Sequence, residues 1–226
     1  MKILSWDVGI AHLAYWFGEM TEKQSLITLE WDLINLIPEH KCDLCSKKAT
    51  LFKDTNYRCE KHKETGKWKK IPNCKTSDVE DLKESLVKIL DTLPQFLDAK
   101  VVIIENQPSL KNPKMKAIAC CLSDYFLIRG KIDGGIETVR FISPLNKLKI
   151  ADETLLNNPK VKELKETIKD KYKLTKKLGI LYAELMLSDK ECWKMLDKHK
   201  KKDDCVDSLL QMYNYVNKNY GKCEFK

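Results

Sequence analysis

The sequence contains little arginine and no long apolar segment. Only three of its 41 basic residues are arginine, and the rest are lysine. The longest uninterrupted apolar run is the six residues 117–122, whereas a membrane-spanning helix needs about 20. The N-terminal segment MKILSWDVG also lacks the apolar h-region of a secretory signal. These absences exclude a membrane protein and lead us to expect a protein of the cytoplasm or nucleus that is not secreted.

Two further absences narrow the class of protein. There is no GxxxxGK[ST] loop, which argues against an ATPase. The nine cysteines are an odd number that includes the adjacent Cys120 and Cys121, and no export signal accompanies them, so a framework of disulfides does not fit. We therefore expect reduced thiols and interpret any close cluster of them as metal ligands.

Positive charge is concentrated in two segments. The chain carries 41 basic and 33 acidic residues, a net charge of +8. Residues 41–75 contain 11 basic and 4 acidic residues, and residues 160–202 contain 14 lysines and 7 acidic residues. Two basic blocks on an acidic body favour a polyanionic partner, although a lysine-rich surface without a partner fits the composition equally well. Lysine neutralises phosphates without reading bases, so we expect recognition of shape more than of sequence.

Periodicity predicts an α/β protein. Three strands come first, an insertion without a sustained period follows, and helices then alternate with strands. A capping box at Ser77–Glu80 begins the first helix, and Asn112 with Pro113 begins the next. This order predicts a mixed five-stranded sheet flanked by helices, with an antiparallel edge. The strands are expected at 2–7, 10–17, 25–34, 101–104 and 136–142, and the last helix at 203–216.

Acidic residues follow or flank the predicted buried elements. Asp7 ends the first strand, and Glu105 directly follows the apolar run VVII. Asp204 and Asp207 share one face of the last helix. Converging carboxylates repel one another unless cations neutralise them, and Mg²⁺ prefers such oxygen ligands; two ions about 4 Å apart suit phosphodiester hydrolysis. Individually, Asp7 also suits a turn cap, and Asp203 and Asp204 suit charges at a helix N-terminus.

At these residues the chain resembles the RuvC-type Holliday-junction resolvases of the RNase H-like superfamily, most nearly those of large DNA viruses such as poxviruses and iridoviruses. The similar segments are ILSWDVGIAHLAYW, VVIIENQPSLKNPKM, ISPLNK and KKDDCVDSLLQ. The resemblance extends along the chain except for residues 40–75.

The resemblance implies an RNase H-like sheet and a metal-dependent endonuclease that resolves four-way DNA junctions by paired symmetric nicks. It implies a homodimer, two Mg²⁺ or Mn²⁺ ions per active site, and an intracellular location that includes viral factories. Asp204 is preferred over Asp203 because the family spacing is Asp-x-x-Asp. The catalytic and metal-binding residues would be Asp7, Glu105, Asp204 and Asp207.

Two other functions stay open. One is a different RNase H-like nuclease that cuts RNA–DNA hybrids or flaps. The other is a zinc-containing nucleic-acid-binding protein that has no catalytic activity.

Residues 40–75, which we name the module, contain a pattern typical of zinc sites. Cys42-x2-Cys45 and Cys59-x2-His62 form two short knuckles separated by 13 residues. Their sulfur and nitrogen donors suit one tetrahedral Zn²⁺ per chain.

Two questions about the module stay open. Cys74 or His40 is an alternative to His62 as the fourth zinc ligand. The zinc would fold an insertion too small to have its own core. The module is then either purely structural or presents basic residues and Trp68 to DNA, the lysines being Lys61, Lys63, Lys67, Lys69 and Lys70.

Eight further lysines are predicted to bind DNA. Three surround a helix N-terminus, where backbone amides and the helix dipole favour phosphate, two follow the fifth strand, and three crowd one basic segment. Each of them alone also suits a solvated surface. The set is Lys111, Lys114, Lys116, Lys147, Lys149, Lys173, Lys176 and Lys177.

The chain is predicted to consist of a nuclease domain, residues 1–39 and 76–226, and the inserted module.

Overall fold

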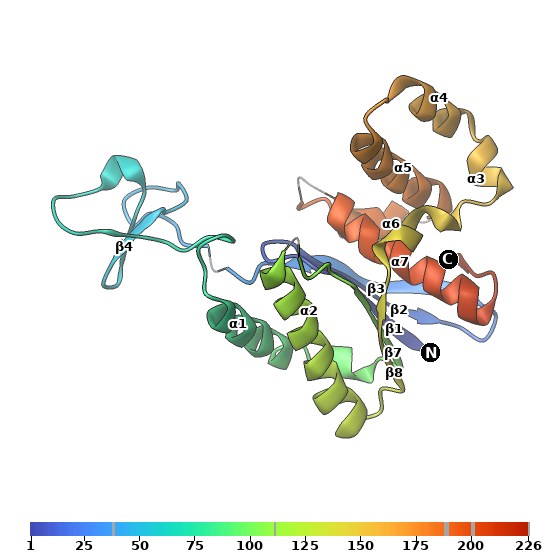
Figure 1. Ribbon diagram of the computed structural model, residues 1–226, viewed down its shortest axis with the longest axis horizontal. Helices are drawn as coiled ribbons and strands as arrows, with labels where there is room; N and C mark the ends of the chain where they lie inside the picture. The colour runs from blue at the N-terminus through green and yellow to red at the C-terminus, as the bar shows by residue number, and fades with distance from the viewer. Residues whose placement is uncertain (38, 111, 188–189, 200–201, 226) are drawn as a thin grey trace.

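The computed structural model describes residues 1–37, 39–110, 112–187, 190–199 and 202–225. Its centre is a six-stranded mixed sheet in the order β8-β7-β1-β2-β3-β9 (Figure 1). The first three strands form an antiparallel meander, and β7 and β8 run parallel to β1. The strands are β1 (Lys2–Asp7), β2 (Leu13–Met20), β3 (Ser25–Ile34), β7 (Val101–Glu105), β8 (Thr138–Ile142) and β9 (Glu224–Phe225).

Helices cover both faces of this sheet (Figure 1). On one face lie α1 (Val79–Asp91) and α2 (Pro113–Tyr125). The other face carries α5 (Lys171–Met186), α6 (Lys190–Lys194) and α7 (Asp203–Tyr220), of which α7 packs directly on β1 and β2. The short helices α3 (Glu153–Asn157) and α4 (Pro159–Thr167) lie beyond α5. This arrangement confirms the predicted α/β class with a mixed sheet flanked by helices.

Strand alternation divides the core into two layers. Successive side chains of a strand point to opposite faces of a sheet. In β1, Ile3 packs on the α7 side, whereas Leu4 and Trp6 pack on the α1 and α2 side. In β7, Val101 and Ile103 alternate with Val102 and Ile104 in the same way. Both strands are buried on both faces, which explains the unbroken apolar run VVII of β7 and the apolar residues on both faces of β1.

Several element boundaries differ from the sequence-based prediction. The second strand begins at Leu13, not at residue 10. The N-cap of α1 is Asp78, whose carboxylate accepts from the Glu80 amide, while the Ser77 hydroxyl donates to the Asn73 carbonyl, so the predicted capping box is wrong. A sixth strand, β9, forms because α7 returns the C-terminus to β3, where Phe225 stacks on a tyrosine of α7.

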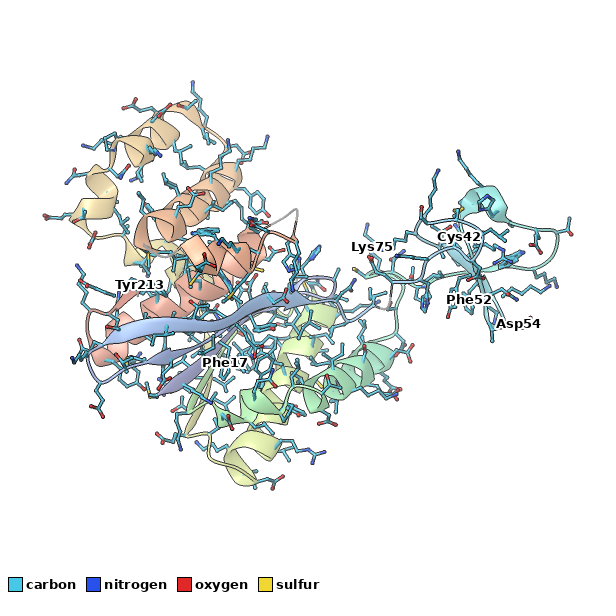
Figure 2. The ribbon with its side chains drawn as sticks, turned by 180° about the vertical axis from the view of Figure 1, so that it is seen from behind. Phe17, Cys42, Phe52, Asp54, Lys75 and Tyr213 are labelled. Atoms are coloured by element: carbon cyan, nitrogen blue, oxygen red, sulfur yellow. The ribbon has the colours of Figure 1, made fainter. Side chains whose placement is uncertain are left out.

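The module has its own small sheet. Its strands are β4 (Leu51–Lys53), β5 (Asn56–Arg58) and β6 (Lys69–Lys70), in the order β5-β4-β6. Figure 1 shows the module projecting from the body of the protein, and Figure 2 places Cys42 and Phe52 on it and Lys75 where the chain returns to the body. None of the helices in the described ranges has the length and apolar character that a membrane span requires.

Truncation of a core leucine tests this packing. Leu86 of α1 is fully buried, whereas Leu110 is 98% exposed. We expect Leu86→Ala to lower the free energy of unfolding by about 2–5 kcal/mol through lost burial and a residual cavity. Leu110→Ala is the matched control, with an expected change within about 0.5 kcal/mol. Urea unfolding measures both values, and equal stability of the two variants would contradict the packing described here.

Candidate active site

Two carboxylates meet at the end of the parallel strand pair. β1 and β7 are in register with Trp6 opposite Ile104, so Asp7 and Glu105 follow side by side at their carboxyl ends. Alternation turns both side chains toward the α7 face, because they share the parity of the residues that pack there. The Gln107 amide donates to Glu105 Oε2 at 2.7 Å and fixes that carboxylate. Gln107 was not predicted, and its only sequence signal is its position two residues after Glu105.

Helix α7 is held against β1 by buried hydrogen bonds. The Ser5 hydroxyl donates to the Ser208 carbonyl at 2.7 Å, and the Gln211 amide donates to the Trp6 carbonyl at 3.0 Å. From β3, the Trp31 indole donates to the Cys205 carbonyl at 2.8 Å. These bonds fix the first turns of α7 relative to the sheet, and so they set where its acidic residues lie.

A single ammonium group joins three of the carboxylates. Lys147 Nζ lies 2.7 Å from Asp7 Oδ1 and 3.2 Å from both Glu105 Oε1 and Asp207 Oδ2. Its side chain is only 11% exposed. Lys147 comes from the 3-10 helix Pro144–Ile150 that follows β8, so four separate parts of the chain meet at this atom. The sequence indicated Lys147 as a DNA-binding residue, whereas the structure places it among the acids.

The charges of this group depend on one another. Burial raises the pKa of Asp7 well above its ordinary value despite the lowering effect of the Lys147 ammonium. Burial acts in the same direction on Glu105, but its hydrogen bond with Asp7 and the charge of Lys147 lower the pKa of Glu105. Burial disfavours the Lys147 charge, yet the three carboxylates raise its pKa. The two carboxyl groups therefore titrate as a pair, in which Asp7 is the more readily protonated member.

A second lysine contacts the acids of α7. Lys176 Nζ, from α5, lies 2.9 Å from Asp207 Oδ2, 3.1 Å from Asp203 Oδ2 and 3.4 Å from Asp204 Oδ1. Although burial opposes it, the charge of these carboxylates raises the pKa of Lys176. Lys176 was also predicted to contact DNA; in the structure its ammonium neutralises acids at the start of α7.

The acids open into a cleft of about 610 Å³. Asp7, Glu105, Asp204 and Asp207 line this cleft, and Asp203 does not. This placement favours Asp204 over Asp203, because only a side chain that reaches the cleft can share a ligand with the other three. The rim carries His12, Leu145 and Tyr172.

The donor set fits a hard divalent cation. Three carboxylate oxygens already surround one positive group, the Lys147 ammonium. The same three oxygens could neutralise a metal cation at that position. Carboxylate oxygens are the ligands that Mg²⁺ and Mn²⁺ favour. The side chains that would hold such ions are those of Asp7, Glu105, Asp204 and Asp207.

The structure also brings together the four predicted zinc ligands. The donor atoms of Cys42, Cys45, Cys59 and His62 all lie within 4.8 Å of one another. Cys45 Sγ and Cys59 Sγ are 3.8 Å apart, close to the spacing of about 3.8 Å that Zn–S bonds of about 2.3 Å give in a tetrahedron. Burial raises the pKa of Cys42, but backbone amides of Cys59 and Leu44 lower it to about 6, which favours a thiolate ligand.

The two alternative ligands lie elsewhere. The His40 ring stacks on Tyr57, with centroids 3.8 Å apart. Cys74 packs against the core layer on the α1 side of the sheet. Among the described residues, neither belongs to the group of donors that could share one zinc ion.

The remaining predicted DNA-binding lysines differ in their surroundings. Lys114 Nζ donates to the carbonyls of Lys75 and Ser77 at 2.7 and 2.6 Å, and Lys116 Nζ donates to Asn106 Oδ1 at 2.9 Å. Lys111 lies outside the described residues. The lysines that are exposed are Lys149, Lys173 and Lys177.

Comparison with solved structures identifies the fold. The fowlpox virus resolvase, solved as a complex with substrate Holliday-junction DNA, aligns with a TM-score of 0.54 and 16% identity over 97% of this chain and 99% of that one. The yeast mitochondrial Holliday-junction resolvase Ydc2 aligns with a TM-score of 0.50 and 19% identity over 97% of this chain and 82% of that one. The chain therefore has the fold of the RuvC-type Holliday-junction resolvases.

At the level of sequence, the chain is 30% identical to the uncharacterized protein L451 of Acanthamoeba polyphaga mimivirus, over 99% of this chain and 79% of that protein. It belongs to the same family as this viral protein. No protein-family model matches the chain.

Replacement of single cysteines tests the zinc cluster. We expect Cys59→Ser to reduce zinc from about one ion per chain to none, because three donors no longer complete a tetrahedral site. Limited proteolysis should then cut within the module, because a small insertion that loses its zinc loses the contacts that fold it. The matched control is Cys74→Ser, which should keep its zinc. Metal analysis of the purified proteins measures the result, and retention of zinc by Cys59→Ser would exclude this ligand set.

Removal of the central ammonium tests the carboxylate group. In buffer without added divalent cations, Lys147→Gln should lower the free energy of unfolding by about 3–5 kcal/mol, because it leaves buried carboxylates without a counter-charge. Millimolar Mg²⁺ should restore much of this loss by binding the same oxygens. Lys149→Gln, an exposed change in the same 3-10 helix, is the control. A thermal-shift series that finds no Mg²⁺ effect on Lys147→Gln would argue against cation binding here.

Proposed function

We propose that the protein is a metal-dependent, structure-selective DNA endonuclease that resolves four-way (Holliday) junctions by paired symmetric nicks. One observation carries this proposal: Asp7, Glu105 and Asp207 converge in an open cleft. Their carboxylates all contact the buried ammonium of Lys147. Its support is the fold, because two solved proteins of this fold are Holliday-junction resolvases and one of them was solved with junction DNA.

Asp7, Glu105, Asp204 and Asp207 are the proposed catalytic residues and would hold two Mg²⁺ or Mn²⁺ ions. Such ions supply an activated water and stabilise the leaving oxygen in phosphodiester hydrolysis. The fold holds these side chains in position. The pairing of β1 with β7 places Asp7 beside Glu105, and Gln107 orients Glu105 through a hydrogen bond. The hydrogen bonds between α7 and β1 place the acids of α7 next to this pair.

The basic groups of the cleft prepare it for a phosphodiester. The Lys147 and Lys176 ammoniums hold the acids together and also add two positive charges beside them. Lys149 and Lys173 follow Lys147 and Tyr172 of the cleft wall in the chain, and both are exposed. A negatively charged backbone is thus drawn toward acids that would otherwise repel it.

Paired nicks require two active sites on one junction. The described residues of each chain form one carboxylate cleft, so we propose that the protein acts as a homodimer. A closed two-fold dimer is the commonest symmetric assembly, and it matches the symmetric placement of two cuts.

Substitution of a carboxylate tests the catalytic assignment. We expect Asp7→Asn to lower the rate of junction cleavage by more than about 100-fold, since even the outer partners of metal ligands cost about 10- to 100-fold when mutated. Junction binding should persist, because phosphate contacts carry most of the affinity. Asp133→Asn, an exposed change of the same kind, should cut as the wild type does. Single-turnover cleavage and electrophoretic mobility shift assays measure the two quantities.

The choice of substrate tests the rest of the proposal. Purified wild-type protein with Mg²⁺ or Mn²⁺ is compared on four-way junctions, flaps and RNA–DNA hybrids. Paired symmetric nicks on the junction support the proposal. Preference for hybrids or flaps indicates another nuclease of this fold, and binding without cleavage under either cation indicates a protein without catalysis.

A further inference from the structure

We propose that the module and the groove at its base bind the phosphate backbone of a duplex DNA arm that extends from the cleft. This inference rests on the proposed function, which supplies the DNA. It gives the module a role beyond folding around zinc.

The module presents lysines that the protein itself does not neutralise. Lys61, Lys63, Lys67, Lys69 and Lys70 are all exposed. Among the described residues, none of these five forms an ion pair. A purely structural insertion requires ligands and a few packed residues, and it has no need of unneutralised surface charge.

Two of the module's acids are already engaged with its arginine. Arg58 Nη1 lies 2.5 Å from Asp43 Oδ2, and its Nη2 lies 3.6 Å from Glu64 Oε1. The Arg58 guanidinium also lies over the Trp68 ring, 5.8 Å from its centroid. The buried arginine therefore neutralises part of the module's acidic charge, and the five exposed lysines still outnumber the two remaining exposed acids, Asp54 and Glu60.

The zinc cluster and the small sheet fix where these lysines lie. Lys61 and Lys63 flank the ligand His62, so the metal site holds them in place. Lys69 and Lys70 form β6 and pair with Phe52 and Leu51 of β4. The fold therefore sets the backbone positions from which these exposed lysines project.

A groove connects the module to the active-site cleft. It has a volume of about 560 Å³ and lies between the module and the body. Ala11 and His12 line both this groove and the cleft that holds the carboxylates. The groove therefore continues the cleft toward the module.

The groove carries groups that bind phosphate and few free acids. Its donors include His12, Asn35, His40, Lys70 and Asn73. Of the two acids in its wall, Glu39 is neutralised by the Lys48 ammonium at 2.5 Å, whereas Glu60 accepts a hydrogen bond from the Thr50 hydroxyl at 3.4 Å and keeps its charge. Amide, imidazole and ammonium groups position a nucleic-acid backbone without reading its bases.

Both connections to the module are tied to the body. On the way out, the Leu36 amide donates to the Ile10 carbonyl at 3.0 Å and its carbonyl accepts from the Ser85 hydroxyl at 2.9 Å. On the way back, Lys114 Nζ donates to the carbonyls of Lys75 and Ser77. The base of the module thus keeps a defined position beside the cleft.

The partner that fits these features is a DNA backbone of regular shape. The lysines offer point charges without the bidentate geometry with which arginine reads guanine. A branched DNA bound at its centre sends duplex arms away from the cleft, and an arm that follows the groove would meet the module's lysines.

A charge-removal experiment tests the inference. The module variant Lys67→Ala/Lys69→Ala/Lys70→Ala is compared with the control Lys160→Ala/Lys162→Ala/Lys165→Ala. The control removes three exposed lysines from α4, which lies at the far side of the body from the module (Figure 1). Both are made in the Asp7→Asn background so that no strand is cut, and zinc content is measured to show that the module is folded.

We expect the module variant to bind a four-way junction about 10-fold or more weakly at low salt. The slope of log affinity against log salt concentration should become less steep by up to about 2.7, because each lost phosphate contact reduces the slope by about 0.9. The α4 control should keep the affinity and slope of the parent. An unchanged affinity and slope in a zinc-loaded module variant would overturn the inference.

The two proposals fail in different ways. If the wild type cuts junctions but the module variant binds like the control, the further inference fails and the proposed function stands. If the wild type cuts no branched DNA but the module variant still loses affinity and salt dependence, the module binds DNA and the proposed function fails.

Discussion

The site depends on one buried ammonium among three carboxylates. Like charges about 4 Å apart repel by roughly 4 kcal/mol at the effective dielectric of a protein surface, and burial increases this cost. Lys147 Nζ contacts Asp7, Glu105 and Asp207 at once and offsets that repulsion. Because these residues come from β1, β7 and α7, one electrostatic contact joins the sheet to the helix that covers it. The arrangement of the carboxylates in the cleft consequently depends on how α7 packs on the sheet.

The two basic blocks of the sequence play different parts in the structure. In the block at residues 160–202, Lys176 forms ion pairs with the acids of α7. Part of the positive charge of this block is therefore neutralised within the protein. The module keeps its lysines on the surface and pairs two of its four acids with Arg58. The two blocks therefore have the same net charge but differ in how much of it is available to a partner, because a partner binds only charge that the protein itself leaves unneutralised.

Much of the fold could be predicted because its signals are local. The strand Ser25–Ile34, the Asn112 cap and the end of β8 before Pro144 all follow from periodicity and backbone chemistry. The predicted start of α1 was wrong, since Ser77 and Asp78 are both good caps and the Asn73 carbonyl takes the Ser77 hydroxyl. In the site, Gln107 and the bonds from Ser5, Trp31 and Gln211 gave no distinct signal, because buried polar residues resemble surface ones in sequence.

The sequence by itself determined the α/β class and indicated which acids end strands and which cysteines and histidines have the spacing of zinc ligands, because each follows from residue type, spacing or position at a strand end. Only the tertiary structure decided that Lys147 and Lys176 lie among the acids, that Asp204 reaches the cleft while Asp203 does not, and that the groove beside the module continues the cleft. These facts depend on contacts between residues far apart in the chain, which local patterns do not encode.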